Sequence, residues 1–121
     1  MKYKILSLRP FLGSKNFEQS SAFYREMGFD EVKLWEGFSV FTRQGFSFYL
    51  QNAYIKDWIE NTQIFIETED LENILNELSA LGLPEKFSAV RVSGLSHQSW
   101  GSEFFVHDPS GNLLHFGSFN R

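Results

Sequence analysis

The chain has 121 residues, a formal net charge of −4 and no cysteine, and 42% of its residues are hydrophobic. This length and balance predict one globular domain, residues 1–121, with a modest core. The missing cysteines exclude disulfides, thiol nucleophiles and thiolate metal sites. The acidic balance argues against nucleic-acid binding, which needs a basic surface. No long apolar run or signal-peptide pattern occurs, so we expect no membrane partner and a cytoplasmic protein.

The first half of the chain predicts a strand, a helix and three further strands. A strand around Pro10 is followed by Asn16, a good N-cap, and Gln19 lies three residues later to complete a capping box. The helix ends at Gly28, which suits the left-handed residue after a helix. The three strands are expected around residues 30–34, 38–43 and 46–51. A hairpin turn is expected at Gln44-Gly45.

The second half repeats this order. Asp70 is the expected N-cap of its helix and Gly82 the expected stop. Apolar residues recur at helical spacing in between, at Leu71, Ile74, Leu75, Leu78 and Leu81. Strands are expected around residues 89–93, 103–107 and 113–117. Residues 84–96 read as a loop and residues 52–61 as the linker between the halves.

The two halves are an internal repeat. Residues 9–29 align without a gap with residues 63–83. Each copy is predicted to contain a strand, an N-cap residue, a helix and a glycine that ends the helix, in this order. Two βαβββ modules follow from this repeat, at about residues 1–52 and 62–121. We therefore predict an α+β fold in which the two modules form curved mixed sheets.

The closing hairpin is the most specific part of the sequence. Asp108, Pro109, Ser110 and Gly111 suit the four positions of a type I turn. The run Trp-Gly-x-Glu-Phe, followed by Asp-Pro-x-Gly-Asn and His-Phe, resembles the closing hairpin of the bleomycin resistance proteins. These are non-enzymatic, antibiotic-sequestering members of the glyoxalase/bleomycin resistance/dioxygenase superfamily, which is also called the vicinal oxygen chelate superfamily. The resemblance covers nearly the whole chain and includes Pro10, Phe23, Gly28-Phe29, Phe38 and Asn61-Thr62.

The resemblance also indicates where a metal would be held. Enzymes of the superfamily place His, Glu or Gln ligands on the first and last strands of each module. The repeat puts these positions at Arg9, Tyr49, Gln63 and His115. Arginine stays protonated and Tyr and Gln are weak ligands, whereas a catalytic site needs about three protein ligands. Only His115 is a plausible donor, so we expect no metal, no cofactor and no catalysis.

The same resemblance implies a ligand groove formed across a dimer. Aromatic side chains at Phe38 and Trp100 would stack on a flat heteroaromatic part of the ligand. The complete ligand-binding set is predicted to be Phe38, Gln51, Phe65, Trp100, Gly111, His115, Lys33 and Trp58. Packing in the core is the competing interpretation for the aromatic members. Gln51 and Lys33 depart from the pattern of the resistance proteins, so the groove can be kept while the ligand differs.

The resemblance further implies a homodimer with N-terminal strand exchange. Pro10 cannot donate to a strand ladder, and in the resistance proteins a proline there marks where the first strand crosses to the partner. By this analogy, residues up to about Arg9 are exchanged between chains. The predicted function is non-enzymatic binding of a small cationic aromatic molecule, with bleomycin as archetype. The alternatives are a metal-dependent lyase, isomerase or dioxygenase, and a module that binds a metabolite.

Overall fold

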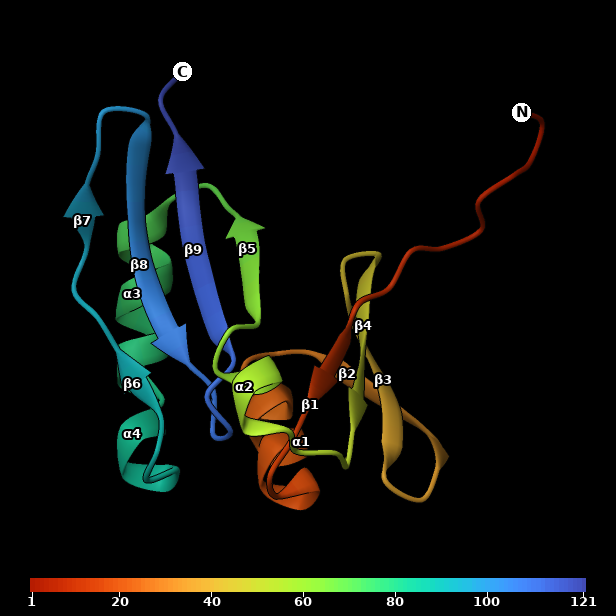
Figure 1. Cartoon of the computed structure of the whole chain (residues 1–121). Coiled ribbons are helices and arrows are strands. Elements are labelled where there is room, and N and C mark those ends of the chain that lie inside the picture. Colours follow the sequence, from red (N-terminus) through yellow and green to blue (C-terminus); the bar gives the residue numbers. More distant parts are fainter.

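The computed structural model describes all 121 residues, which form two mixed sheets standing side by side (Figure 1). Sheet A has the order β1-β4-β3-β2, and sheet B the order β5-β9-β8-β6, with β7 also paired to β8. Sheet A consists of β1 (Phe11–Gly13), β2 (Asp30–Trp35), β3 (Phe38–Arg43) and β4 (Phe46–Gln51). Sheet B consists of β5 (Gln63–Glu67), β6 (Arg91–Val92), β7 (Ser96–His97), β8 (Gly101–His107) and β9 (Leu113–Phe119). The α+β class and the two-sheet arrangement are as predicted.

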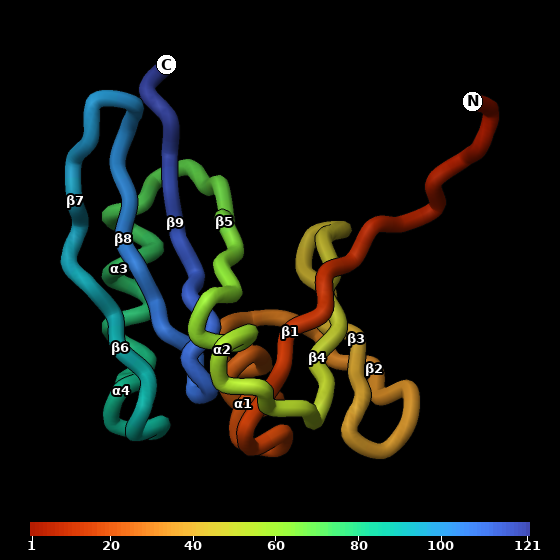
Figure 2. Tube along the Cα trace, viewed as in Figure 1, coloured from red at the N-terminus to blue at the C-terminus, as the bar shows by residue number.

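Four helices complete the fold. They are α1 (Phe17–Glu26), α2 (Lys56–Ile59), α3 (Leu71–Ala80) and α4 (Leu83–Lys86). Helix α3 packs behind β8 and β9, and α1 packs on β2 and β4. No helix has the length and apolar character needed to cross a membrane. The start of the chain runs away from the body of the molecule, as the chain trace shows (Figure 2), whereas Arg9 and Pro10 bond to Tyr49 of β4.

The register confirms the repeat. The first and last strands of each module pair in parallel, β1 with β4 and β5 with β9. Phe11 lies opposite Tyr49 in sheet A, and Phe65 lies opposite His115 in sheet B. Tyr49 and His115 therefore occupy equivalent positions in three dimensions, as the repeat predicts.

The predicted helix starts are confirmed in both modules, but only the first has a side-chain capping bond. Asn16 caps α1 by accepting a hydrogen bond from the Gln19 N–H at 3.0 Å, as predicted. Asp70 stands at the N-cap position of α3, as predicted, but its side chain makes no capping bond and its backbone is left-handed, with φ of 57°. A side-chain cap normally sits on extended backbone, which aims its oxygen at the first helical N–H groups.

The segment before the last hairpin is more structured than a loop. The strand predicted at residues 89–93 is shorter in the structure, where β6 has two residues. The loop predicted at residues 84–96 overlaps α4 and β7. Pro84 explains α4, since proline is favoured in the first turn of a helix. Ser93 explains the short β6. Its hydroxyl oxygen accepts the Phe105 N–H at 2.7 Å and so replaces a backbone acceptor in the ladder.

One hydrophobic core serves both modules. Sixteen buried apolar residues form a single cluster, contributed by the helices and by the inner face of each sheet. Phe41 stacks on Phe48 in sheet A, and Phe104 stacks on Phe116 in sheet B at 5.0 Å between ring centroids. Successive side chains on a strand point to opposite faces. Each sheet therefore keeps a second face that points away from this core.

A buried carboxylate connects the two modules. Asp108 is fully buried, and its Oδ1 accepts hydrogen bonds at 2.9 Å from three consecutive backbone N–H groups, residues 110–112. Its Oδ2 accepts the Tyr24 hydroxyl of α1 at 2.6 Å and the Asn112 amide at 2.8 Å. The Asn112 amide also donates to the Gly13 carbonyl at the end of β1, at 3.0 Å. The turn that closes the second module is thereby fastened to the helix and first strand of the first.

The protonation states favour this arrangement. Burial, and then the neighbouring Asp108 carboxylate, raise the pKa of Tyr24 well above its ordinary range. The phenol therefore stays protonated and available as a donor. Burial also raises the pKa of Asp108, and hydrogen bonds from Tyr24, Asn112 and the turn oppose that rise.

We predict that Tyr24→Phe destabilises the fold by about 1–3 kcal/mol, since one donor to a buried carboxylate is lost while the ring packing is kept. The free energy of unfolding from urea titration at pH 7 measures this loss. Tyr49→Phe is the matched control, because it removes a hydroxyl from an exposed hydrogen bond. It should change stability by no more than about 0.5 kcal/mol. Equal effects of the two substitutions would contradict a connecting role for Tyr24.

The stability difference also depends on pH. Above about pH 10 a tyrosine in the unfolded chain ionises, whereas Tyr24 with its raised pKa keeps its proton in the folded protein. The folded state then binds more protons than the unfolded state, so stability falls as pH rises. Between pH 9.5 and 11 we expect wild type to lose more stability than Tyr24→Phe. Parallel curves would contradict the raised pKa.

Candidate functional site

The outward face of sheet A carries a ladder of aromatic rings. Trp35 stacks on Phe38 at 4.6 Å with planes 12° apart, and Phe38 stacks on Tyr49 at 5.0 Å and 21°. Phe11 packs against both Phe38 and Tyr49. Trp35 and Phe11 are more than half exposed, at 64% and 55%. Gln51 lies directly opposite Phe38 in the register. These five residues are called the aromatic face of sheet A.

The outward face of sheet B carries a second aromatic cluster. Phe65, Trp100 and Phe119 lie with ring centroids 5.2 to 6.1 Å apart. Gly117 makes the cluster possible, because a Cβ atom there would lie 2.3 Å from the Phe65 ring. The ring therefore lies across β9, over a position with no side chain. Together with His115, these aromatic residues are called the aromatic face of sheet B.

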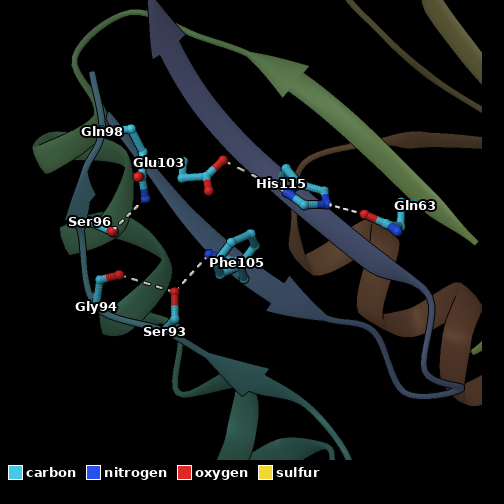
Figure 3. A network of polar contacts seen from close by, with 8 residues as sticks. All are labelled: Gln63, Ser93, Gly94, Ser96, Gln98, Glu103, Phe105 and His115. Carbon is cyan, nitrogen blue, oxygen red and sulfur yellow. Dashed lines mark hydrogen bonds and ion pairs between the residues drawn. The ribbon is translucent and has the colours of Figure 1, made fainter. Parts of the chain in front are cut away.

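A line of polar side chains crosses the same face (Figure 3). The Nε2 atom of His115 lies 2.7 Å from Oε1 of Gln63 on β5, and its Nδ1 atom lies 3.9 Å from Oε2 of Glu103 on β8. Phe105 packs edge-on against the imidazole at 4.9 Å. Both ring nitrogens of His115 thus face polar neighbours within the sheet.

The corresponding positions of the first module form a similar pair. The Arg9 guanidinium donates to the Tyr49 hydroxyl at 2.9 Å and lies 5.5 Å from the centre of the Tyr49 ring. The four positions at which superfamily enzymes would hold a metal are therefore two hydrogen-bonded pairs, one in each module. No three His, Cys, Asp or Glu side chains are grouped so that they could share a metal ion. This donor set does not fit a catalytic divalent metal.

The structure brings some of the predicted ligand-binding residues together. Phe38 and Gln51 share the aromatic face of sheet A, and Phe65, Trp100 and His115 share that of sheet B. Within one chain, these two groups lie on different sheets.

The other three predicted residues lie elsewhere. Lys33 pairs with Ser39, whose side chain is fully buried, so Lys33 is on the helix side of sheet A. Gly111, with φ of 107°, lies in the turn that Asp108 organises. Trp58 lies on α2 and is 70% exposed. Contact of these three with a ligand stays a prediction.

The predicted ligand-binding set did not include Trp35, Phe11 and Phe119 of these faces, or Glu103 beside them. Phe11 is the repeat equivalent of Phe65, so the internal alignment could have identified it. Phe119 lies two residues after Gly117 on β9, hence on the same face. Glu103 stands inside the Trp-Gly-x-Glu-Phe run but was not assigned a role.

The comparisons with known proteins agree with this architecture. No protein-family model matches the chain, and no curated protein is significantly similar to it. A bleomycin-binding protein from the bleomycin-producing Streptomyces verticillus, solved with copper(II)-bleomycin, is 20% identical with a TM-score of 0.79, over 98% of this chain and 100% of that one. An antibiotic-binding protein from Streptomyces sp. CB03234 is 18% identical with a TM-score of 0.75, over 98% and 100%. A Bacillus anthracis protein assigned to the glyoxalase family is 18% identical with a TM-score of 0.73, over 99% and 100%.

These similarities cover nearly the full length of every chain compared. The protein therefore has the vicinal oxygen chelate fold, which antibiotic-binding proteins and the glyoxalase family share. The resemblance read from the closing hairpin is confirmed at the level of the fold.

We predict that the purified protein binds no stoichiometric metal, because the Arg9–Tyr49 and Gln63–His115 pairs occupy the ligand positions. Elemental analysis after dialysis, with Zn, Ni, Mn or Fe added back, measures the metal content. A metal bound one to one and lost in His115→Ala would contradict this expectation. The result would then favour a metal-dependent enzyme.

Proposed function

We propose that this protein binds a small, planar, cationic molecule without transforming it, in grooves formed between two copies of the chain. The observation that carries the proposal is the pair of aromatic faces, which stay open although buried residues of both sheets share one core. Exposed rings such as Trp35 and Phe65 are costly to leave in water and indicate a binding surface. A groove between sheet A of one chain and sheet B of the other would bring both faces to one ligand.

The chemistry of the two faces suits a flat cation. Stacking on aromatic rings contributes about 1–3 kcal/mol per ring by analogy with base stacking, and it requires no particular ring substituents. Cations are attracted both to aromatic faces and to an acidic protein. A dimer would carry a formal charge of −8, twice the −4 of one chain. Bleomycin-type antibiotics carry such features, and proteins with this fold bind bleomycin.

The N-terminal segment supports dimer formation. Tyr3, Leu6 and Leu8 are 71%, 86% and 81% exposed in the single chain. The regular pairing with β4 begins where Tyr49 N–H donates to the Pro10 carbonyl at 2.9 Å, so residues 1–9 are outside the sheet. A cleft of about 1420 Å³ is lined by residues of both modules, including Phe48 and Ile66, and by residues 6–10 of the N-terminal segment itself. In a dimer with strand exchange, the segment of the second chain would take the place of this one at the cleft and bury its own apolar residues.

A metal-dependent enzyme of the same fold is the second candidate. It would require His115 to exchange its contacts with Gln63 and Glu103 for a metal ion. The metal analysis described above distinguishes it from a binding protein. A module that binds a metabolite would show the same groove and the same lack of turnover, and only the identity of the ligand separates it from an antibiotic-binding protein.

We predict a stable homodimer in solution, which loses affinity when residues 1–9 are deleted. The deletion removes the apolar segment that would cross to the partner, while β1 and the core stay intact. Multi-angle light scattering at micromolar concentration measures the mass. A monomeric full-length protein would contradict the prediction. If the deletion variant dimerises with the same affinity as the full-length protein, strand exchange is contradicted.

We predict that Trp100→Ala weakens ligand binding about five- to a hundredfold, the equivalent of one lost stacking contact. Titration of bleomycin, then of a panel of other cationic aromatic compounds, measures the change. Tyr54→Ala is the matched control, since Tyr54 is a part-exposed ring outside both aromatic faces. It should bind as wild type does.

The outcomes of this titration separate the parts of the proposal. If bleomycin fails and another compound binds in a Trp100-dependent manner, the groove is correct and the archetypal ligand is wrong. If nothing binds, or if Trp100→Ala unfolds the protein in a melting experiment, the tryptophan is structural and the proposed groove is wrong.

A further inference from the structure

One carboxylate on the aromatic face of sheet B lacks hydrogen-bond partners. The Glu103 side chain is only 14% exposed, yet it accepts no hydrogen bond from any other residue, and its nearest partner is His115 Nδ1 at 3.9 Å. In Figure 3 its carboxylate points across the sheet toward the imidazole. A largely buried carboxylate is normally compensated by donors or a positive charge. Glu103 thus has acceptor capacity that the chain does not use.

An aromatic ring lies directly beside this carboxylate. Glu103 on β8 and Gly117 on β9 are opposite one another, and directly opposed Cα atoms in an antiparallel pair lie about 4.5–5.5 Å apart. The Phe65 ring extends over Gly117 into the space that a Cβ atom would fill. The edge of the ring and the carboxylate therefore border the same position on the sheet. A flat cation above Phe65 would place its charged group within reach of Glu103.

A second carboxylate borders Gly117 from the other side, but its charge is already paired. Glu67 on β5 is also opposite Gly117 in the register. Its Oε2 lies 3.2 Å from the Arg121 guanidinium, and its side chain is 51% exposed. Glu67 is therefore half exposed and paired with a cation, whereas Glu103 is mostly buried and has no hydrogen-bond donor. The two residues differ in availability while carrying the same charge on the same face.

We propose that Glu103 selects for positive charge in the ligand by accepting hydrogen bonds from an amidinium or guanidinium group whose aromatic body stacks on Phe65. The inference rests on the proposed binding function and specifies the chemical group that the site recognises. Amidinium and guanidinium groups are planar and present paired N–H donors to a carboxylate. They can remain coplanar with an attached ring, so the stacking and the hydrogen bonds are compatible.

A pair of shape-matched probes tests the proposal. Naphthalene-2-carboxamidine is cationic, and naphthalene-2-carboxamide has nearly the same shape and no charge. Isothermal titration calorimetry on the full-length protein measures both affinities. Wild type should bind the amidine at least about tenfold more tightly than the amide, the effect expected of a charge-assisted hydrogen bond. Glu103→Gln should remove most of that preference and leave the affinity for the amide within about twofold.

Glu67→Gln is the matched control, because it makes the same change in charge on the same face. It should keep the preference for the amidine. Glu103→Asp is a second variant, in which the carboxylate is kept on a side chain one methylene shorter. Its preference for the amidine over the amide should lie between those of wild type and Glu103→Gln. Thermal melting of each variant verifies that the fold is retained.

Each result has a defined meaning. Equal losses in Glu67→Gln and Glu103→Gln would show a general electrostatic field and overturn the role of Glu103. A loss of both probes in Glu103→Gln, or equal affinity of wild type for both, would also overturn it while the groove still stands. If wild type binds neither probe at millimolar concentration, the proposed binding function itself is contradicted.

Discussion

The Asp108 carboxylate accepts five hydrogen bonds where the closing hairpin meets α1, and the position of one sheet relative to the other depends on it. Three of the donors belong to the turn itself and fix its shape. Tyr24 belongs to the first module, and Asn112 carries the connection on to β1 through the Gly13 carbonyl. A buried charge with fewer donors would be unstable, so the turn and the contact between modules depend on one another.

The alternation of side chains along the strands explains how this scaffold can carry a binding surface. One face of each sheet is committed to the shared core, which holds the modules together. The opposite faces are not part of this core, and here they carry aromatic rings and a few polar side chains. The four positions that would form a metal centre in the enzymes of this fold are two hydrogen-bonded pairs, Arg9 with Tyr49 and Gln63 with His115. The same positions therefore carry polar contacts within each outward face.

Much of the fold could be predicted from the sequence because the repeat is encoded locally. Glycine stops, the Asn16 cap and the alignment of the two halves predict the register, which the structure confirms at Tyr49 and His115. The sequence predicted Asp70 at the N-cap of α3 but not its missing side-chain bond, since the backbone leaving β5 is left-handed there and composition does not reveal it.

The candidate site was predictable only in part. Phe38 and Trp100 were predicted from the family resemblance, and Phe65 as a further aromatic candidate. Lys33 lies on the helix side of sheet A because of the strand register. An error of one residue in a predicted register moves every side chain of the strand to the opposite face. The Phe65 ring lies next to Glu103 because Gly117 has no side chain and leaves room for the ring. This contact joins strands that are far apart in the sequence.

In the proposed dimer, two chains join their aromatic faces around a planar cation. A crystal structure of the protein with the tightest-binding compound of the cationic panel would show whether they do. We expect the ligand's flat ring between Phe38 of one chain and Trp100 of the other, in two equivalent grooves. A ligand bound within a single chain, or a dimer whose aromatic faces both point to solvent, would contradict it.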